Sequence, residues 1–140
     1  MAGLVEGKVA LVTGGRRQLG RAQAIRLAEA GADVAISDVV GEDGMIKETV
    51  REIEKCGRKG LGIVANVSKK SDVENMIQKT VKELGGIDIL VNNAGVSSRQ
   101  TLFTVEEDEW DDVININLKG VVLCSQLAAQ VMVKQGRGGS

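Results

Sequence analysis

The chain is 140 residues long, which suits one domain (residues 1–140) with a single core. Hydrophobic residues make up 43% and charged residues 26%, and the net charge of −1 is spread without basic blocks, so we expect no nucleic-acid partner and no anionic membrane surface. Uninterrupted apolar runs are far shorter than the roughly 20 residues of a membrane span, and the N-terminus carries no secretory leader pattern.

Several reactive residue types are missing or scarce. The sequence has no His and no Tyr, and its two cysteines, Cys56 and Cys124, form no CxxC pair. Zinc sites and Ser–His or Cys–His nucleophile systems are therefore excluded within these residues, and we predict no metal site. We interpret the cysteines as reduced thiols of a cytoplasmic protein. Because an enzyme lacking both His and Tyr would be unusual, we expect the N-terminal part of a longer protein.

Short apolar stretches alternate with helical patterns along the chain. The strand candidates are rich in Val and Ile, as in a parallel sheet covered on both faces, and they span 8–13, 33–37, 60–66 and 87–92. Helical periodicity occupies 19–30, 42–55 and 71–84, then a long region from Thr104 to about Lys134 with a bend near 115–117. This alternation predicts an α/β fold with right-handed crossovers.

The last two helical regions carry signals at their starts and on their surfaces. Ser71-Asp-Val-Glu74 and Thr104-Val-Glu-Glu107 fit the capping-box pattern and predict two helix starts. Residues 113–133 are apolar almost all round the helix. One face is expected to cover the sheet, which leaves the other for more of the chain or for a partner helix.

The turn Thr13-Gly-Gly-Arg-Arg-Gln-Leu-Gly20 joins the first strand to the first helix. Free backbone N–H groups at a helix N-terminus suit a phosphate, and glycines allow its close approach. The dinucleotide pattern GxGxxG does not fit this turn. The P-loop pattern has the right spacing at Gly15 and Gly20, but Arg21 and Ala22 replace its Lys and its magnesium-holding Ser/Thr.

The same turn matches TGxxxGxG except at Gln18, which stands in place of the middle glycine. Further along are Asp88-Ile-Leu-Val-Asn-Asn-Ala-Gly95, Asn115-Ile-Asn-Leu-Lys-Gly120 and the acid Asp38 after the second strand. Together these motifs cover nearly all 140 residues, and in this order they resemble the short-chain dehydrogenase/reductase family.

The resemblance implies a Rossmann-like doubly wound parallel sheet with strand order 3-2-1-4, which stops before the fifth strand that Ser140 would open. It also implies hydride transfer between NAD(P) and a carbonyl or secondary alcohol carbon of a small alcohol or ketone. Residues 96–103 could touch that substrate. The helical region 104–134 is expected to build a homo-oligomer. The alternative is a non-catalytic nucleotide-binding or interaction module of the same fold.

The resemblance assigns cofactor contacts residue by residue. Thr13 is either one of them or a structural residue that holds the turn through its hydroxyl group, and Asn92 is expected to tie strands together. The carbonyl oxygen of Asn66 could accept a hydrogen bond from the adenine amino group. The expected cofactor-binding residues are Gly14, Arg16, Arg17, Gln18, Leu19, Gly20, Asp38, Asn66, Val67, Asn93, Ala94 and Gly95.

The sequence contains conflicting indications about the cofactor. Asp38 can accept both ribose hydroxyls and repels a 2′-phosphate, whereas Arg16 and Arg17 favour NADP. We predict NAD, because the acid is short and fixed whereas an arginine can swing into solvent; NADP remains the alternative.

Of the catalytic residues that the resemblance implies, only Asn117 has a place in the sequence. An Asn at this position in a helix kink would hold a water in the proton path. The Tyr and its Lys are expected beyond residue 140, so the chain as given should bind nucleotide weakly at most and should not catalyse.

Overall fold

The computed structural model describes residues 3–140 as an α/β fold built on a four-stranded parallel sheet. The strand order β3-β2-β1-β4 confirms the predicted doubly wound, Rossmann-like arrangement. All neighbouring strands run parallel, with Leu11 of β1 opposite Ala35 of β2 and Leu90 of β4. The strands are β1 (Val9–Thr13), β2 (Asp33–Asp38), β3 (Gly60–Val64) and β4 (Ile89–Val91).

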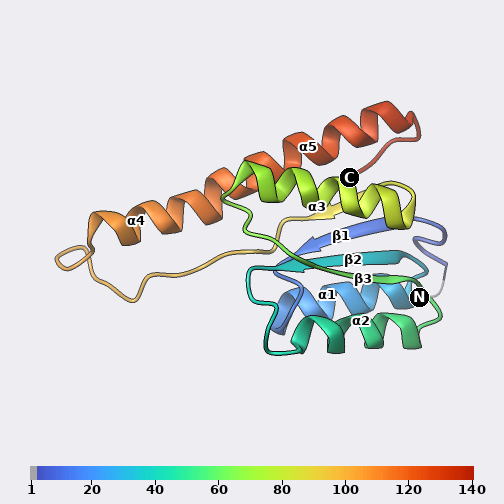
Figure 1. Ribbon diagram of the computed structural model, residues 1–140, viewed down its shortest axis with the longest axis horizontal. Coiled ribbons are helices and arrows are strands. Elements are labelled where there is room, and N and C mark those ends of the chain that lie inside the picture. Colours follow the sequence, from blue (N-terminus) through green and yellow to red (C-terminus); the bar gives the residue numbers. More distant parts are fainter. Residues whose placement is uncertain (1–2) are drawn as a thin grey trace.

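Helices cover both faces of the sheet (Figure 1). Helices α1 (Gln18–Glu29) and α2 (Met45–Lys55) lie on one face, and α3 (Lys70–Leu84) and α5 (Gly120–Gln135) lie on the other. Alternate side chains of β1 pack into two hydrophobic clusters, one on each face of the sheet. Ala10 and Val12 pack toward α1 and α2, whereas Leu11 packs with Met76 of α3 and Cys124 of α5. This double covering explains why the strands are apolar on both faces.

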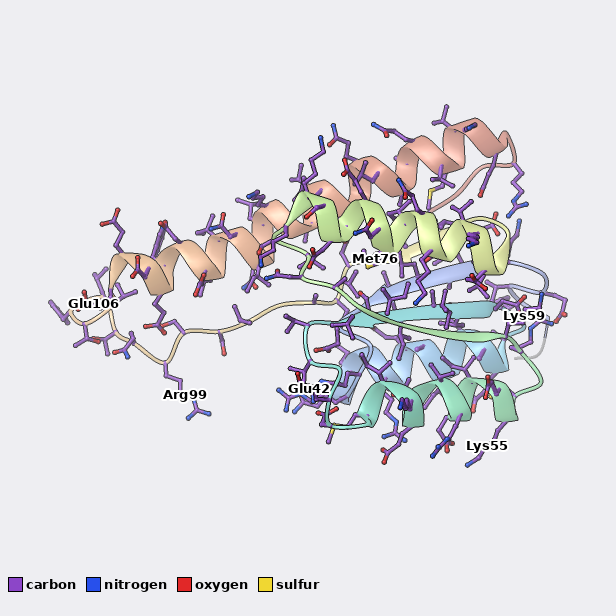
Figure 2. All side chains as sticks on the ribbon, in the orientation of Figure 1. Glu42, Lys55, Lys59, Met76, Arg99 and Glu106 are labelled. Carbon is purple, nitrogen blue, oxygen red and sulfur yellow. The ribbon has the colours of Figure 1, made fainter. Side chains whose placement is uncertain are left out.

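The fourth helical region is longer and less regular than the others. Helix α4 (Glu107–Ile114) leads through a π-helical turn, η1 (Asn115–Lys119), into α5, so a π-helical turn stands where a bend was predicted near 115–117. None of the residues of α4 is buried, and this helix extends away from the sheet at the end of a long connection from which Arg99 projects (Figure 2). By length and composition alone Glu107–Gln135 could cross a membrane, but core helices of soluble proteins pass the same test.

Both capping-box predictions are wrong. Helix α3 begins at Lys70, one residue before Ser71, and α4 begins at Glu107, three residues after Thr104. Neither helix has a side-chain hydrogen bond at its N-cap. The Thr104 hydroxyl instead bonds within its own loop, where it accepts a hydrogen bond from the backbone N–H of Thr101 and donates to Gln100.

Asp88 anchors the amino end of β4. Its buried carboxylate accepts hydrogen bonds from the backbone N–H of Val9 at 2.9 Å and from Nε of Arg137 at 2.6 Å. The backbone of Ser140 bonds to β4 on the side opposite β1, through the Asp88 carbonyl at 2.9 Å and the Leu90 N–H at 2.8 Å. Burial alone would raise the pKa of Asp88, but the bonds from Arg137 and Val9 hold it below its ordinary value of 3.8.

We expect Asp88→Asn to lower the free energy of unfolding by about 1.5–3 kcal/mol, the range for hydrogen bonds to a charged group. Because the folded-state pKa is depressed, this stability is present above the unfolded pKa and is lost as pH falls through the folded pKa. The difference between wild type and variant should therefore shrink below about pH 4. Urea unfolding from neutral pH downward measures it, with the exposed Asp108→Asn as the control. A difference that does not change with pH would contradict the assignment.

Candidate functional site

A cavity of about 370 Å³ opens at the carboxyl ends of the strands, where a parallel α/β sheet commonly binds its ligand. All twelve residues predicted to contact the cofactor line it. The structure adds residues that were not expected at the cofactor, because they carry no characteristic side chain: Ser37, Val39, Val40, Ala65 and Ile116. Val96, from the loop expected to touch the substrate, lines the same cavity.

The glycine-rich turn comes close to the end of β4. Gly14 has φ +68°, and a Cβ on it would lie 2.9 Å from the Cα of Ala94. A Cβ on Gly20 would overlap the carbonyl oxygen of Gly14 and would lie 2.5 Å from Nδ2 of Asn93. Both positions therefore require glycine, and the backbone N–H groups at the start of α1 remain close to the cavity. The first turn of α1 holds no acidic residue that would repel an anion.

Gln18 is strained at the position of the missing glycine. With φ +49°, it is the only non-glycine residue with positive φ within residues 3–140. The left-handed conformation costs a non-glycine residue roughly 1–2 kcal/mol. Its side chain is exposed and lines the cavity.

Thr13 ties the two strand ends together. Its buried Oγ1 accepts hydrogen bonds from the backbone N–H groups of Asn93 at 3.1 Å and Ala94 at 3.0 Å. The structural alternative for Thr13 is therefore confirmed. Asn93 completes the link by donating from Nδ2 to the carbonyls of Thr13 at 3.0 Å and Gly14 at 3.1 Å. Asn92, expected to tie strands, instead donates to Oγ of Ser125 in α5 at 3.0 Å.

Arg16 is buried, with 8% of its surface exposed. Its Nε lies 3.3 Å from Oδ1 of Asp38, and its Nη1 is paired with Oδ2 of Asp43. Of the two arginines, Arg16 is therefore held and does not swing into solvent. Only Arg17 can do so, because it is exposed at the cavity and forms no ion pair within the described part of the chain. Sequence reasoning missed Asp43, which lies in a polar turn without a recognisable motif.

The amide of Asn66 is used within its own turn. Its Oδ1 accepts hydrogen bonds from the backbone N–H of Ser68 at 3.0 Å and from the Ser68 hydroxyl at 2.7 Å. Both lone pairs of the carbonyl oxygen are thus occupied, which argues against its predicted bond to an adenine amino group. Asp72, inside the expected capping box, accepts from the backbone N–H of Asn66 at 2.9 Å.

Asn117 lies in η1 and holds the loop that follows β4. Its Oδ1 accepts from the backbone N–H of Val96 at 2.8 Å, and its Nδ2 donates to the Val96 carbonyl at 2.7 Å. Both ends of the amide are therefore engaged with one residue of the cavity wall. Single π-helical turns are rare and occur often at functional sites.

The comparisons with known proteins agree with this architecture. The profile of the short chain dehydrogenase family matches residues 8–140. The chain belongs to this family. A short-chain dehydrogenase/reductase of Armillaria gallica is 44% identical over 134 residues, which are 96% of this chain and 51% of that protein.

Two solved structures with bound cofactor resemble the chain closely. Carveol dehydrogenase from Mycobacterium avium, in complex with NAD, matches with a TM-score of 0.92 and 31% identity over 99% of this chain and 54% of that one. A short chain dehydrogenase from Burkholderia cenocepacia, in complex with NADP, matches with a TM-score of 0.87 and 39% identity, over 91% of this chain and 51% of that one. The chain spans about half the length of the curated relatives that it matches.

The link between β1 and β4 leads to a test at Thr13. Thr13→Val keeps the shape of the side chain but removes the acceptor of two backbone N–H groups, so we expect it to lower the free energy of unfolding by about 1–3 kcal/mol. Thr13→Ser retains the hydroxyl and should stay much closer to wild type. Urea unfolding measures both. A Thr13→Val variant as stable as wild type, with the loss confined to Thr13→Ser, would show that the methyl group matters and the hydroxyl does not.

Proposed function

We propose that the cavity binds the dinucleotide NAD and that the protein transfers a hydride between it and the carbonyl or alcohol carbon of a small molecule. The observation that supports this is the gathering of all twelve expected cofactor residues around one cavity at the strand ends. The bound relatives add support, since one holds NAD and another NADP.

The residues present fit linked phosphates at the turn. Gly14 and Gly20 leave no room for side chains of their own, and the exposed Arg17 supplies a positive charge at the start of α1. Two of the three buried side-chain atoms without a hydrogen-bond partner, among the described residues, also belong to this cavity: Nε of Arg16 and Oγ of Ser37. Unsatisfied polar groups of this kind are costly, which favours a polar ligand nearby.

Asp38 is proposed to accept the hydroxyls of the adenosine ribose. Its Oδ1 accepts from the backbone N–H of Val40 at 3.2 Å, which fixes the carboxylate at the cavity wall. A second acidic group, the phosphate of NADP, would be repelled there. Since the oxygen of Asn66 is occupied, its Nδ2 is the group we assign to the adenine edge, as a donor to a ring nitrogen.

Asn117 is proposed to act as a positioning residue. Its two bonds to Val96 hold a loop at the cavity wall and engage both ends of its amide. A water in the proton path would therefore need a hydrogen-bond partner other than this side chain. The bound nicotinamide would supply or accept the hydride. These 140 residues contain no Tyr, and so they offer none of the phenol chemistry that the resemblance implies. We therefore propose that a protein of these residues alone would not catalyse.

Binding of reduced cofactors tests the proposal most directly. In the full-length protein we expect NADH to bind about tenfold or more tightly than NADPH, because the Asp38 carboxylate meets the 2′ position. Asp38→Asn should weaken NADH binding by about tenfold. It should also reduce the difference between the dissociation constants of NADH and NADPH. Titration calorimetry gives the dissociation constants, and Glu54→Gln, an exposed acid on α2, is the matched control.

Tenfold preference for NADPH would refute the NAD assignment, and failure to bind either cofactor would refute the proposed function. A panel of alcohols and ketones, followed by NADH absorbance, then identifies the substrate. Cofactor binding without turnover of any of them would favour the alternative, a nucleotide-binding module, for which the lack of His and Tyr is the supporting observation.

We also propose that the helical region Thr104–Lys134 forms a homo-oligomer. Large apolar side chains on this region are exposed at i, i+4 spacing: Trp110, Ile114, Leu118 and Val122. They form a stripe along α4, η1 and the start of α5, on the side away from buried Cys124 and Ala128. A stripe of this kind is typical of helix–helix association.

Charge placed on the stripe should dissociate the assembly. In the double variant Leu118→Lys with Val122→Lys, association would have to desolvate two charges on each copy of the chain. The mass measured by light scattering should therefore fall to that of a smaller species. Leu4→Lys, at an exposed apolar residue far along the chain, is the control. An unchanged mass for the double variant would place the interface elsewhere.

A further inference from the structure

Arg16 is the only residue of the glycine-rich turn with a buried cation, and it sits between two acids. One is Asp38, which the proposed function assigns to the ribose, and the other is Asp43, in the turn between β2 and α2. Asp43 does not line the cavity. The side chains of Arg16 and Asp38 are largely enclosed, with 9% and 14% exposed, whereas 32% of the Asp43 side chain is exposed. The charges of Arg16 and Asp38 therefore interact in a poorly solvated environment, and Asp43 meets Arg16 from the solvent side.

The two acids hold different parts of the guanidinium group. Asp43 takes Nη1 in a close hydrogen-bonded pair. Asp38 approaches Nε at 3.3 Å, but that nitrogen makes no hydrogen bond and is one of the buried unsatisfied atoms. Asp43 therefore holds the Nη1 end of the guanidinium, and the Asp38 carboxylate, which receives no hydrogen bond from Nε, keeps acceptor capacity for a ligand.

The backbone of Arg16 is fixed independently of its side chain. The hydroxyl of Thr49, which is fully buried in α2, donates to the Arg16 carbonyl at 3.1 Å. Asp43 also accepts from the backbone N–H of Met45 through Oδ1, the oxygen that does not pair with Arg16. A change confined to the charge of Asp43 can thus release the arginine side chain while the turn and the start of α2 keep their bonds.

We propose that Asp43 is a specificity-determining residue, which disfavours a 2′-phosphate by holding Arg16. With Asp43 neutral, the guanidinium is free to pair fully with Asp38 or to meet a phosphate at the same place. Either outcome removes the unbalanced negative charge at the 2′ position. The inference rests on the proposed binding of NAD in this cavity.

The experiment measures dissociation constants of 5′-AMP and adenosine 2′,5′-bisphosphate, together with NADH and NADPH, in the full-length protein. Asp43→Asn should shift the ratio of the two AMP-type constants by about tenfold or more toward the bisphosphate. Glu42→Gln removes the same charge from the neighbouring exposed position in that turn (Figure 2) and should shift the ratio less than about threefold.

Two further variants distinguish the hold of Asp43 on Arg16 from a general effect of charge or of folding. Asp43→Glu retains the carboxylate and should keep the wild-type ratio. Adding Arg16→Gln to Asp43→Asn should abolish the gain for the bisphosphate, since no guanidinium remains to be released. Thermal unfolding of each variant confirms that the comparison is made on folded protein.

Equal shifts in Asp43→Asn and Glu42→Gln, no shift in either, or a shift that persists without Arg16 would each overturn the proposal. NADH binding with an unmoved ratio would refute this inference alone. Wild-type protein that binds neither NADH nor NADPH would refute the proposed function and the inference with it.

Discussion

The site depends on how closely the end of β1 approaches the end of β4. Oγ1 of Thr13 and the side-chain amide of Asn93 take part in four hydrogen bonds between these two strand ends, with distances of 3.0–3.1 Å. Gly20 fits beneath this link only because it has no side chain. The link places the N-terminus of α1 beside the loop after β4, so one cavity receives groups from both.

Where local patterns coincide with burial, the sequence was sufficient to predict the structure. The strands were predicted from apolar runs such as Val9–Thr13, all of whose residues are buried, whereas the strand order was implied by the family resemblance. Helix starts were predicted less well. Ser71 matched a capping box, yet α3 starts before it and the nearby Asp72 bonds to Asn66 instead. A short polar motif has several local partners available, and tertiary contacts decide among them.

Side-chain partners within the site could not be predicted from the sequence. Arg16 and Arg17 are adjacent and identical in type, but one is buried between acids and the other is exposed. That difference depends on the β2–α2 turn, which brings Asp43 back from 27 positions along the chain. The same holds for Asn117, whose partner Val96 is 21 positions away, on a loop without regular structure.

The π-helical turn has a geometric effect on the helices at its two ends. An α-helix advances about 100° per residue, so one residue of extra winding turns the helix before it by about that angle relative to the helix after it. Asn117 reaches Val96, and Gly120 packs against Val67, while Trp110 of α4 is exposed. The turn thus sets how far α4 is rotated about the helix axis relative to α5. Removing a single residue there would restore an uninterrupted α-helical winding and rotate the protruding end by more than a quarter of a revolution.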